Sequence, residues 1–322
     1  MLSIPHRTQS QKTLPASLKI QHTMTAQEIY KDIKQKFIPD NIEIKNLNEA
    51  YDLHDNLFIP FRVELIENGL NGFMPHYRGE QKFGWDILSG IFRPPLEKLS
   101  SEQGKELEQM AVKEFEETIK TNIGENILRN IFNQEKFGKQ WDLLFQAQHG
   151  GVKTTLTDWT GFIQTALFFA TEFSENEEVE NADAQLWCLM VSEQNIISDN
   201  NFFPKESMYN LDPFNIDNVY LINPSIYIDH VDERIFEYRM FKQGGRFLVM
   251  PNDVCNVPIN KHDIFKDFLF RIRVPKEYKP SIRQTLSERG ITRQLMYADE
   301  NPLHNNLIKE INDKIFSNPH NE

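Results

Sequence analysis

The sequence lacks most of the features that mark secreted, membrane and metal-binding proteins. It contains only two cysteines, Cys188 and Cys255, so we expect neither a disulfide framework nor an all-cysteine metal site. Residues 1–20 are polar and have no apolar stretch typical of a signal peptide. The longest apolar run, 160–173, is shorter than the ~20 residues of a membrane helix and contains Gln164. These absences predict a soluble, cytoplasmic protein that binds no membrane.

Several signatures of catalysis and ligand binding are missing as well. The sequence has no Gly-x-x-x-x-Gly-Lys-Ser/Thr phosphate loop, no Gly-x-Ser-x-Gly nucleophile elbow and no His-Glu-x-x-His zinc motif. Its nine histidines show no paired helical spacing that would bind zinc, so we predict no metal site. Acidic residues outnumber basic ones, 47 to 35, and the net charge of −12 excludes a general attraction to nucleic acid, while leaving room for a local basic patch.

The sequence is rich in apolar residues. Its 322 residues are 39% hydrophobic and include 24 phenylalanines, enough to fill the core of one large domain or two small ones. Residues up to Met24 are interpreted as a flexible arm. Thr25 and Glu28 then form a capping box, apolar residues recur at helical spacing, and Pro39 ends the helix. We expect this helix to pack on the main domain.

Helical patterns dominate the first half of the chain and strand patterns the second. The stretch 106–119 is amphipathic, with Glu108 off the apolar face, whereas 162–173 is apolar all round and predicts a buried helix. The acidic stretch 175–183 predicts a solvated loop, and 268–274 alternates as a half-buried strand. The other predicted elements are a central strand over 186–191, strands over 218–222 and 246–250, and helices over 281–289 and 303–315.

These patterns predict an α+β fold with a largely antiparallel sheet. No linker or internal repeat interrupts the middle of the chain. We therefore predict an arm and helix over 1–41, one main domain over 42–300 and a C-terminal helix over 301–322.

Three stretches combine residue types that suit ligand binding. The first is His76-Tyr77-Arg78-Gly79-Glu80, in which an arginine stands beside a glycine. Gly79 would let the backbone approach a ligand closely, and the guanidinium of Arg78 suits a phosphate or a carboxylate. The alternative interpretation is a turn with a solvated arginine. If Arg78 serves in a pocket, Arg78→Ala should abolish activity and cost about 1 kcal/mol or less of stability.

The second stretch runs from Gln148-His149-Gly150-Gly151 to Thr157-Asp158-Trp159-Thr160, ahead of the predicted buried helix. The two glycines predict a tight bend after His149, whose ring could donate a hydrogen bond to a ribose hydroxyl or transfer a proton. Trp159 offers a flat face for a nicotinamide or adenine ring. In the alternative interpretation, Thr157 or Asp158 caps the next helix and Trp159 is packed.

The third stretch comprises Glu237-Tyr238-Arg239 and Gln243-Gly244-Gly245-Arg246-Phe247. It predicts a glycine-rich loop that leads into a strand, with Gln243 at its mouth. The amide of Gln243 can both donate to and accept from a substrate, and Glu237 could stabilise a developing cation. The alternative interpretation is a hairpin turn with surface charges.

Taken together, these stretches resemble the FRG domain family, named for a Phe-Arg-Gly motif, over about residues 45–300. The motif reads Tyr77-Arg78-Gly79 here, and Ile91-Phe92-Arg93-Pro94 resembles the family's Leu-Phe-Arg segment. The most specific part is Gln148-His149-Gly150 followed by Thr154-x-Leu156-x-Asp158-Trp159-Thr160. The ordered series continues with Ala166-x-x-Phe169-Ala170, Arg239-x-x-x-Gln243-x-Gly245-x-Phe247 and Leu286-x-x-x-Gly290-Ile291.

The resemblance implies an ADP-ribosyltransferase-like fold and an enzyme that consumes NAD as a substrate, of the kind found in bacterial and prophage toxin-antitoxin and antiphage defence proteins. Such chemistry breaks the bond between nicotinamide and ribose through an oxocarbenium-like transition state, with RNA, DNA or protein as the acceptor. The implied catalytic residues are Arg78, His149, Asp158, Glu237 and Gln243. The implied NAD-binding residues are Arg78, Gly79, His149, Trp159, Thr160 and Gln243.

Two other functions stay open from the sequence. A non-catalytic module of the same fold could bind a nucleotide or nucleic acid, because basic residues gather late in the chain near two aromatic residues that could stack on bases. These residues are Arg239, Arg246, Lys261, Lys266, Arg271 and Arg273, with Phe241 and Phe247. Alternatively, the N-terminal helix docks an antitoxin or a chaperone. Removing residues up to Asp40 would then abolish partner binding and leave the core folded.

Overall fold

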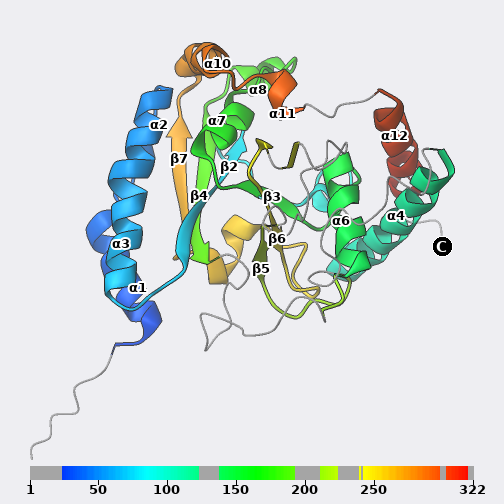
Figure 1. Ribbon diagram of the computed structural model, residues 1–322, viewed down its shortest axis with the longest axis horizontal. Helices are drawn as coiled ribbons and strands as arrows, with labels where there is room; N and C mark the ends of the chain where they lie inside the picture. Colours follow the sequence, from blue (N-terminus) through cyan, green and yellow to red (C-terminus); the bar gives the residue numbers. More distant parts are fainter. Residues whose placement is uncertain are drawn as a thin grey trace, which may run out of the picture.

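A mixed sheet of seven strands runs through the computed structural model, between helices on both sides (Figure 1). The structure describes residues 24–122, 138–192, 211–223, 239–240, 242–297 and 302–317. The strand order is β1-β7-β4-β2-β3-β6-β5, and every neighbouring pair is antiparallel except β1 with β7. The predicted α+β class with a largely antiparallel sheet is therefore confirmed. The strands are β1 (Ile42–Glu43), β2 (Phe73–Glu80), β3 (Thr157–Thr160), β4 (Ala184–Ser192), β5 (Tyr220–Ile222), β6 (Gly245–Val249) and β7 (Leu269–Val274).

Few backbone pairs join strands β2 and β3 near the middle of the sheet. Strand β2 pairs with β4 along the whole length of β2, from Phe73 opposite Ser192 to Glu80 opposite Gln185. In contrast, β2 and β3 pair at a single position, where Tyr77 lies opposite Thr160. Because so little backbone pairing joins these two strands, side chains can occupy the space between the two parts of the sheet.

Helices flank the sheet in two groups (Figure 1). One side carries α1, α2 and α3, and the opposite end carries α4, α6 and α12, which pack on one another. Helix α7 packs directly on β2, and α10 packs on α7. The helices are α1 (Ala26–Phe37), α2 (Leu47–Leu53), α3 (Ile59–Glu67), α4 (Ser101–Asn122), α6 (Lys139–Gly150), α7 (Ile163–Thr171), α8 (Glu177–Glu180), α10 (Lys279–Glu288), α11 (Arg293–Met296) and α12 (Pro302–Phe316).

Helix α1 belongs to the hydrophobic core. Its predicted capping box is confirmed, since the side chains of Thr25 and Glu28 each accept a hydrogen bond from the other residue's backbone. The ring of Tyr30 is fully buried, with its centroid 4.5 Å from that of Phe268 and 5.4 Å from that of Phe73. Removing residues up to Asp40 would delete Tyr30 and uncover Phe73 and Phe268, so we now expect this truncation to destabilise the core. The predicted arm over 1–23 lies outside the described residues.

Most of the other predicted elements are confirmed. The apolar stretch ahead of residue 173 forms α7, which is mostly buried, although Phe162 and Phe173 at its two ends are 46% and 66% exposed. The predicted central strand is β4, inside the sheet, and β7 alternates as expected between buried and exposed residues. Helix α10 ends before Gly290, whose φ of 79° is a conformation that favours glycine.

Three local predictions are wrong. Thr157 and Asp158 do not cap α7, because they lie in strand β3 and Phe162 occupies the cap position. The acidic stretch 175–183 is not only a loop, since Asn176 caps the short helix α8. Helices do dominate the first half of the chain, but strands do not dominate the second half, which also contains α7, α10 and α12.

Glu108 of α4 is fully buried, contrary to its predicted place on a solvated face. One carboxylate oxygen accepts hydrogen bonds from the backbone N–H of Thr155 at 2.6 Å and from its hydroxyl at 2.9 Å, and the other pairs with Lys105 Nζ at 2.9 Å. Lys105 also donates to the Thr155 hydroxyl at 2.8 Å. The periodicity of an isolated helix does not show such a partner. This buried group fixes the segment that leads into β3.

Candidate functional site

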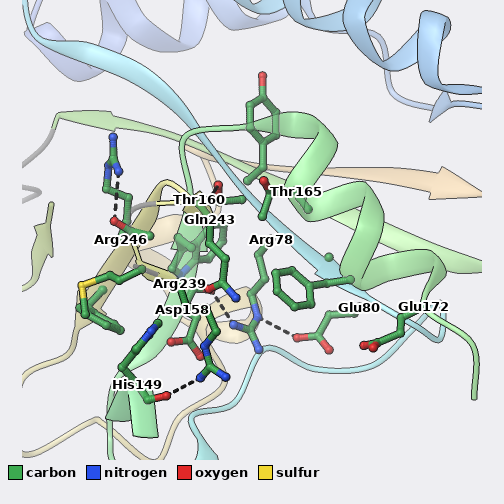
Figure 2. A pocket seen from close by; sticks show the side chains of 18 of the residues that line it. Arg78, Glu80, His149, Asp158, Thr160, Thr165, Glu172, Arg239, Gln243 and Arg246 are labelled. Carbon is green, nitrogen blue, oxygen red and sulfur yellow. Dashed lines mark hydrogen bonds and ion pairs between the residues drawn. The ribbon is translucent and has the colours of Figure 1, made fainter. Parts of the chain in front are cut away.

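A cleft of about 350 Å³ opens beside the single pairing of β2 and β3 (Figure 2). Its walls come from β2 and the turn after it, the end of α6, strand β3, the inner face of α7, the start of β6 and Tyr297. All but one of the residues predicted for the site line this cleft: Arg78, Gly79, His149, Asp158, Trp159, Thr160 and Gln243. Segments far apart in the sequence thus contribute to one site. The remaining prediction, Glu237, lies outside the described residues.

Gly79 is required by packing rather than by a ligand. A Cβ placed on it would lie 1.9 Å from the carbonyl oxygen of Ala166 and 2.7 Å from the backbone nitrogen of Ala170. Any side chain would therefore push α7 away from β2. The close approach expected at this glycine is real, but the backbone that approaches belongs to α7.

The guanidinium of Arg78 bridges the two strands that border the cleft. Its Nε lies 2.7 Å from Oε1 of Glu80, and its Nη1 donates to the backbone carbonyl of Asp158 at 2.6 Å. The side chains of Arg78 and Glu80 are only 10% and 9% exposed. Arg78 is therefore neither the turn residue nor the solvated side chain of the alternative interpretation. Arg78 forms a buried ion pair with Glu80 and also lines the cleft.

Arg93 brings a second guanidinium to the same carboxylate. Its Nη2 lies 3.9 Å from Oε1 of Glu80, and half of its side chain is exposed. Burial and the charge of Arg78 lower the pKa of Arg93, against the attraction of Glu80 and Asp158. The carboxylate of Glu80 thus faces two guanidiniums, and Asp158 is a second carboxylate at this end of the cleft.

Asp158 is held by a chain of side chains. Gln148 Nε2 lies 2.9 Å from both carboxylate oxygens of Asp158. The Gln148 carbonyl oxygen in turn accepts a hydrogen bond from the hydroxyl of Thr154, which is fully buried. Asp158 itself is exposed to the cleft. The carboxylate is thereby oriented through a neutral amide.

The turn before β6 supplies the opposite wall. The side chain of Gln243 donates from Nε2 to the backbone carbonyl of Met296 at 2.7 Å, and the backbone carbonyl of Gln243 accepts from the Thr160 hydroxyl. The guanidinium of Arg239 donates to the backbone carbonyl of His149. Gln243 stands at the start of a glycine-containing turn, as predicted. Both Gln243 and Arg239 line the cleft.

Aromatic rings close the side next to α7. The rings of Phe169 and Tyr297 meet edge to face, with centroids 6.2 Å apart, and both line the cleft. The Tyr297 hydroxyl donates to Glu172 at 3.0 Å, and the Arg293 guanidinium pairs with the same carboxylate. Burial and the neighbouring Glu172 raise the pKa of Tyr297, so this phenol stays protonated near neutral pH.

Trp159 does not provide the exposed ring face that we expected. It is 2% exposed, and its Nε1 donates to the Thr157 hydroxyl at 3.1 Å on the same side of β3. The packed interpretation is therefore the right one for its ring. Phe169 and Tyr297 are better placed to contact a planar ligand. His149 lies in the last turn of α6 and is 6% exposed, at the edge of the cleft.

The sequence analysis assigned no role to several residues of the cleft, among them Glu80, Glu172 and Tyr297. Glu80 stands two residues after Arg78, which places both side chains on one face of a strand, so recognising β2 would have revealed it. Arg93 belongs to a stretch singled out in the sequence, although no role was predicted for it. Glu172 and Tyr297 carry no local signal, because only the tertiary fold brings the end of α7 next to Tyr297.

The late basic residues do not form one patch. Arg239 and Arg246 line the cleft, whereas Arg273 pairs with Glu43 and Asp183. Arg271 lies over the ring of Phe83. The remaining two pair with acidic neighbours, Lys261 with Asp86 and Lys266 with Asp263. Phe247, expected to stack on bases, is 2% exposed and stacks on Phe145 instead, and Phe241 lies outside the described residues.

Within the described ranges, no three His, Cys, Asp or Glu side chains gather in a way that would hold a metal ion. In the same part of the chain, no helix combines the length and the apolar character needed to span a membrane.

Comparisons with known proteins point to one family. Residues 75–179 match the FRG domain, a segment that begins in β2 and ends in α8. It contains Arg78, Arg93, Gln148, Asp158 and Phe169, and therefore much of the cleft. No curated protein and no solved structure matches the chain.

Proposed function

We propose that this chain, a member of the FRG domain family, binds NAD in the β2–β3 cleft and acts as an ADP-ribosyltransferase-like enzyme. The fold would accordingly be a variant of the ADP-ribosyltransferase fold. The acceptor would be RNA, DNA or a protein, in keeping with a toxin or antiphage defence effector. An antitoxin or chaperone would be its natural partner.

The observation that carries this proposal is the charge of the cleft. Four arginines line it, Arg78, Arg93, Arg239 and Arg246, against the three carboxylates Glu80, Asp158 and Glu172. The chain as a whole carries a net charge of −12, so a cleft with more cations than anions is a local exception. A guanidinium donates two parallel hydrogen bonds to a phosphate, which makes a pyrophosphate a suitable ligand.

The cleft also suits the other parts of a dinucleotide. Phe169 and Tyr297 offer apolar ring surface at the side of α7, where a nicotinamide or an adenine could pack. The polar residues His149 and Gln243 lie on the opposite wall, within reach of ribose hydroxyls. An apolar surface with a few fixed polar groups is typical of small-molecule sites.

The chemistry would begin with loss of nicotinamide. The bond between C1′ of the ribose and the nicotinamide nitrogen breaks, the electron pair leaves with nicotinamide, and the sugar becomes cationic. Arginines on the pyrophosphate hold the substrate, and a carboxylate near C1′ lowers the energy of the cation. The acceptor then adds to C1′ and loses a proton.

Turnover of NAD tests the proposal. The full chain is incubated with NAD labelled in its adenylate phosphate, together with RNA, DNA or cell protein in separate reactions, and released nicotinamide is measured by chromatography. We expect nicotinamide release, with label in one class of acceptor. Arg93→Ala should reduce release, whereas Arg289→Ala, outside the cleft, should not.

Two outcomes would count against this activity. No nicotinamide release in any reaction would refute turnover. Binding of NAD without turnover would favour the non-catalytic nucleotide-binding module, which uses the same arginines.

A further inference from the structure

We infer that Asp158 is the carboxylate that acts on the reacting sugar, and that Gln148 and Thr154 position it. This inference rests on the proposed function, which leaves the choice of carboxylate open. It assigns to Gln148 and Thr154 a role that neither residue was predicted to have.

The three carboxylates that line the cleft differ in whether an arginine pairs with them. Glu80 lies 2.7 Å from Arg78, and Glu172 pairs with Arg293, so an arginine compensates the charge of each. Among the residues that the structure describes, the carboxylate of Asp158 forms no ion pair within 4.0 Å, although Arg78 donates to its backbone carbonyl and its charge is felt by Arg93. A carboxylate that forms no direct ion pair stabilises a cationic sugar more strongly than one held by an arginine.

The contacts of Asp158 also suit catalysis. Gln148 reaches both oxygens through one amide nitrogen, at 2.9 Å each, so the carboxylate is oriented without being neutralised. Both residues line the cleft, and Asp158 is exposed to it. A carboxylate oriented by a neutral donor and open to a ligand can face a cation or accept a proton.

The support for Gln148 is itself rigid. The Thr154 hydroxyl donates to the Gln148 carbonyl oxygen and also accepts from the backbone N–H of Leu156 at 3.1 Å. Thr154 is fully buried, and the next residue, Thr155, is held by the buried Glu108. The Thr154 hydroxyl therefore selects the amide orientation that points the NH₂ group of Gln148 at Asp158.

In the reaction, Asp158 would face C1′ as the nicotinamide leaves and positive charge develops on the sugar. When water or the hydroxyl of an acceptor adds to C1′, its proton passes to the Asp158 carboxylate and then to solvent. Thr154 is buried and does not line the cleft, and the side-chain amide of Gln148 is engaged by Asp158 and Thr154. Gln148 and Thr154 act only by fixing the carboxylate, so their effect should depend on the presence of Asp158.

A double-mutant cycle on nicotinamide release tests this inference. We expect Asp158→Asn to lower kcat by about 10²-fold or more with a small change in KM. Gln148→Ala and Thr154→Val should each lower kcat by about 10-fold, whereas Thr154→Ser, which keeps the hydroxyl, should restore it. In the Asp158→Asn background, Gln148→Ala should have no further effect. Gln284→Ala, on α10 and outside the cleft, is the matched control.

The outcomes separate the inference from the proposed function. Wild-type turnover with unchanged kcat in Asp158→Asn or Gln148→Ala would overturn the inference alone. Equal losses from Gln148→Ala in both backgrounds would also overturn it, since that pattern indicates a general structural effect. Absence of turnover in the wild-type chain would overturn the proposed activity and the inference together. Melting temperatures of all variants identify any loss of folded protein.

Discussion

Arg78 and Glu80 form an ion pair that stands between the core and the cleft. Nε of Arg78 lies 2.7 Å from Oε1 of Glu80, and each side chain is about nine-tenths buried. The pair therefore contributes to folding, and its arginine is also the central guanidinium of the proposed binding site. Stability and binding must be separated before Arg78 variants can be interpreted.

Arg78→Ala should destabilise the protein by about 2–3 kcal/mol, because it leaves Glu80 charged and without its closest partner. This is more than the sequence alone led us to expect for a pocket residue. The double variant Arg78→Ala/Glu80→Gln should regain most of that stability and still fail to bind NAD. Urea denaturation and calorimetric titration measure the two effects. Recovery of binding in the double variant would refute a role for Arg78 in the site.

Glu80→Gln alone should strengthen the binding of phosphate-bearing ligands. The carboxylate of Glu80 competes with a ligand phosphate for Arg78 and Arg93, and an amide competes less. We expect the affinity for ADP-ribose to rise about 10-fold, a change of about 1.4 kcal/mol. Nicotinamide, which carries no phosphate, should bind as before. An unchanged affinity for ADP-ribose would mean that the phosphates lie elsewhere.

Gly79→Ala should destabilise the protein by about 3 kcal/mol or prevent folding, since the new methyl group would overlap the backbone of Ala166. Gly90→Ala is the matched control, because the nearest atom to a Cβ at that position lies 3.7 Å away. Thermal unfolding of both variants compares them. Similar melting temperatures would show that α7 can move away from β2 at little cost.

The stability of the fold should fall between pH 7 and pH 5 because of His76. Burial, helped by the charge of Arg246, lowers the pKa of His76 to about 3, against the ordinary value of 6.5. The unfolded chain therefore takes up a proton in this range and the folded chain does not, so folding loses about 2 kcal/mol from this group by pH 5. His76→Leu should flatten that part of the profile of unfolding free energy against pH. An equally steep profile in the variant would assign the effect to other groups.

The sequence predicted the parts of this fold that depend on local pattern. The capping box of Thr25 and Glu28 and the alternation of β7 are properties of short segments, and both were recognised. Strand β2 was missed because Met74-Pro75-His76 does not alternate in hydrophobicity, although the strand is paired on both sides. The short β3 was taken for a helix cap, since Thr and Asp suit either place.

In the cleft, too, the sequence predicted what depends on local pattern and did not predict what depends on tertiary packing. Arg78, His149, Asp158 and Gln243 were found because unusual residues stand together in the sequence, and the fold brings them to one place. The exposure of a ring could not be predicted in the same way. Trp159 is buried by contacts with distant residues, whereas Tyr297 reaches the cleft through its contact with Glu172.

Calorimetric titration of the full chain with ADP-ribose tests the central claim most directly, because it requires no turnover and no acceptor. We predict binding at a single site, weakened at least 10-fold by Arg93→Ala, about 1.4 kcal/mol, and unchanged by Arg289→Ala. No binding of ADP-ribose by the wild-type chain, or equal binding by both variants, would contradict a nucleotide site in the β2–β3 cleft.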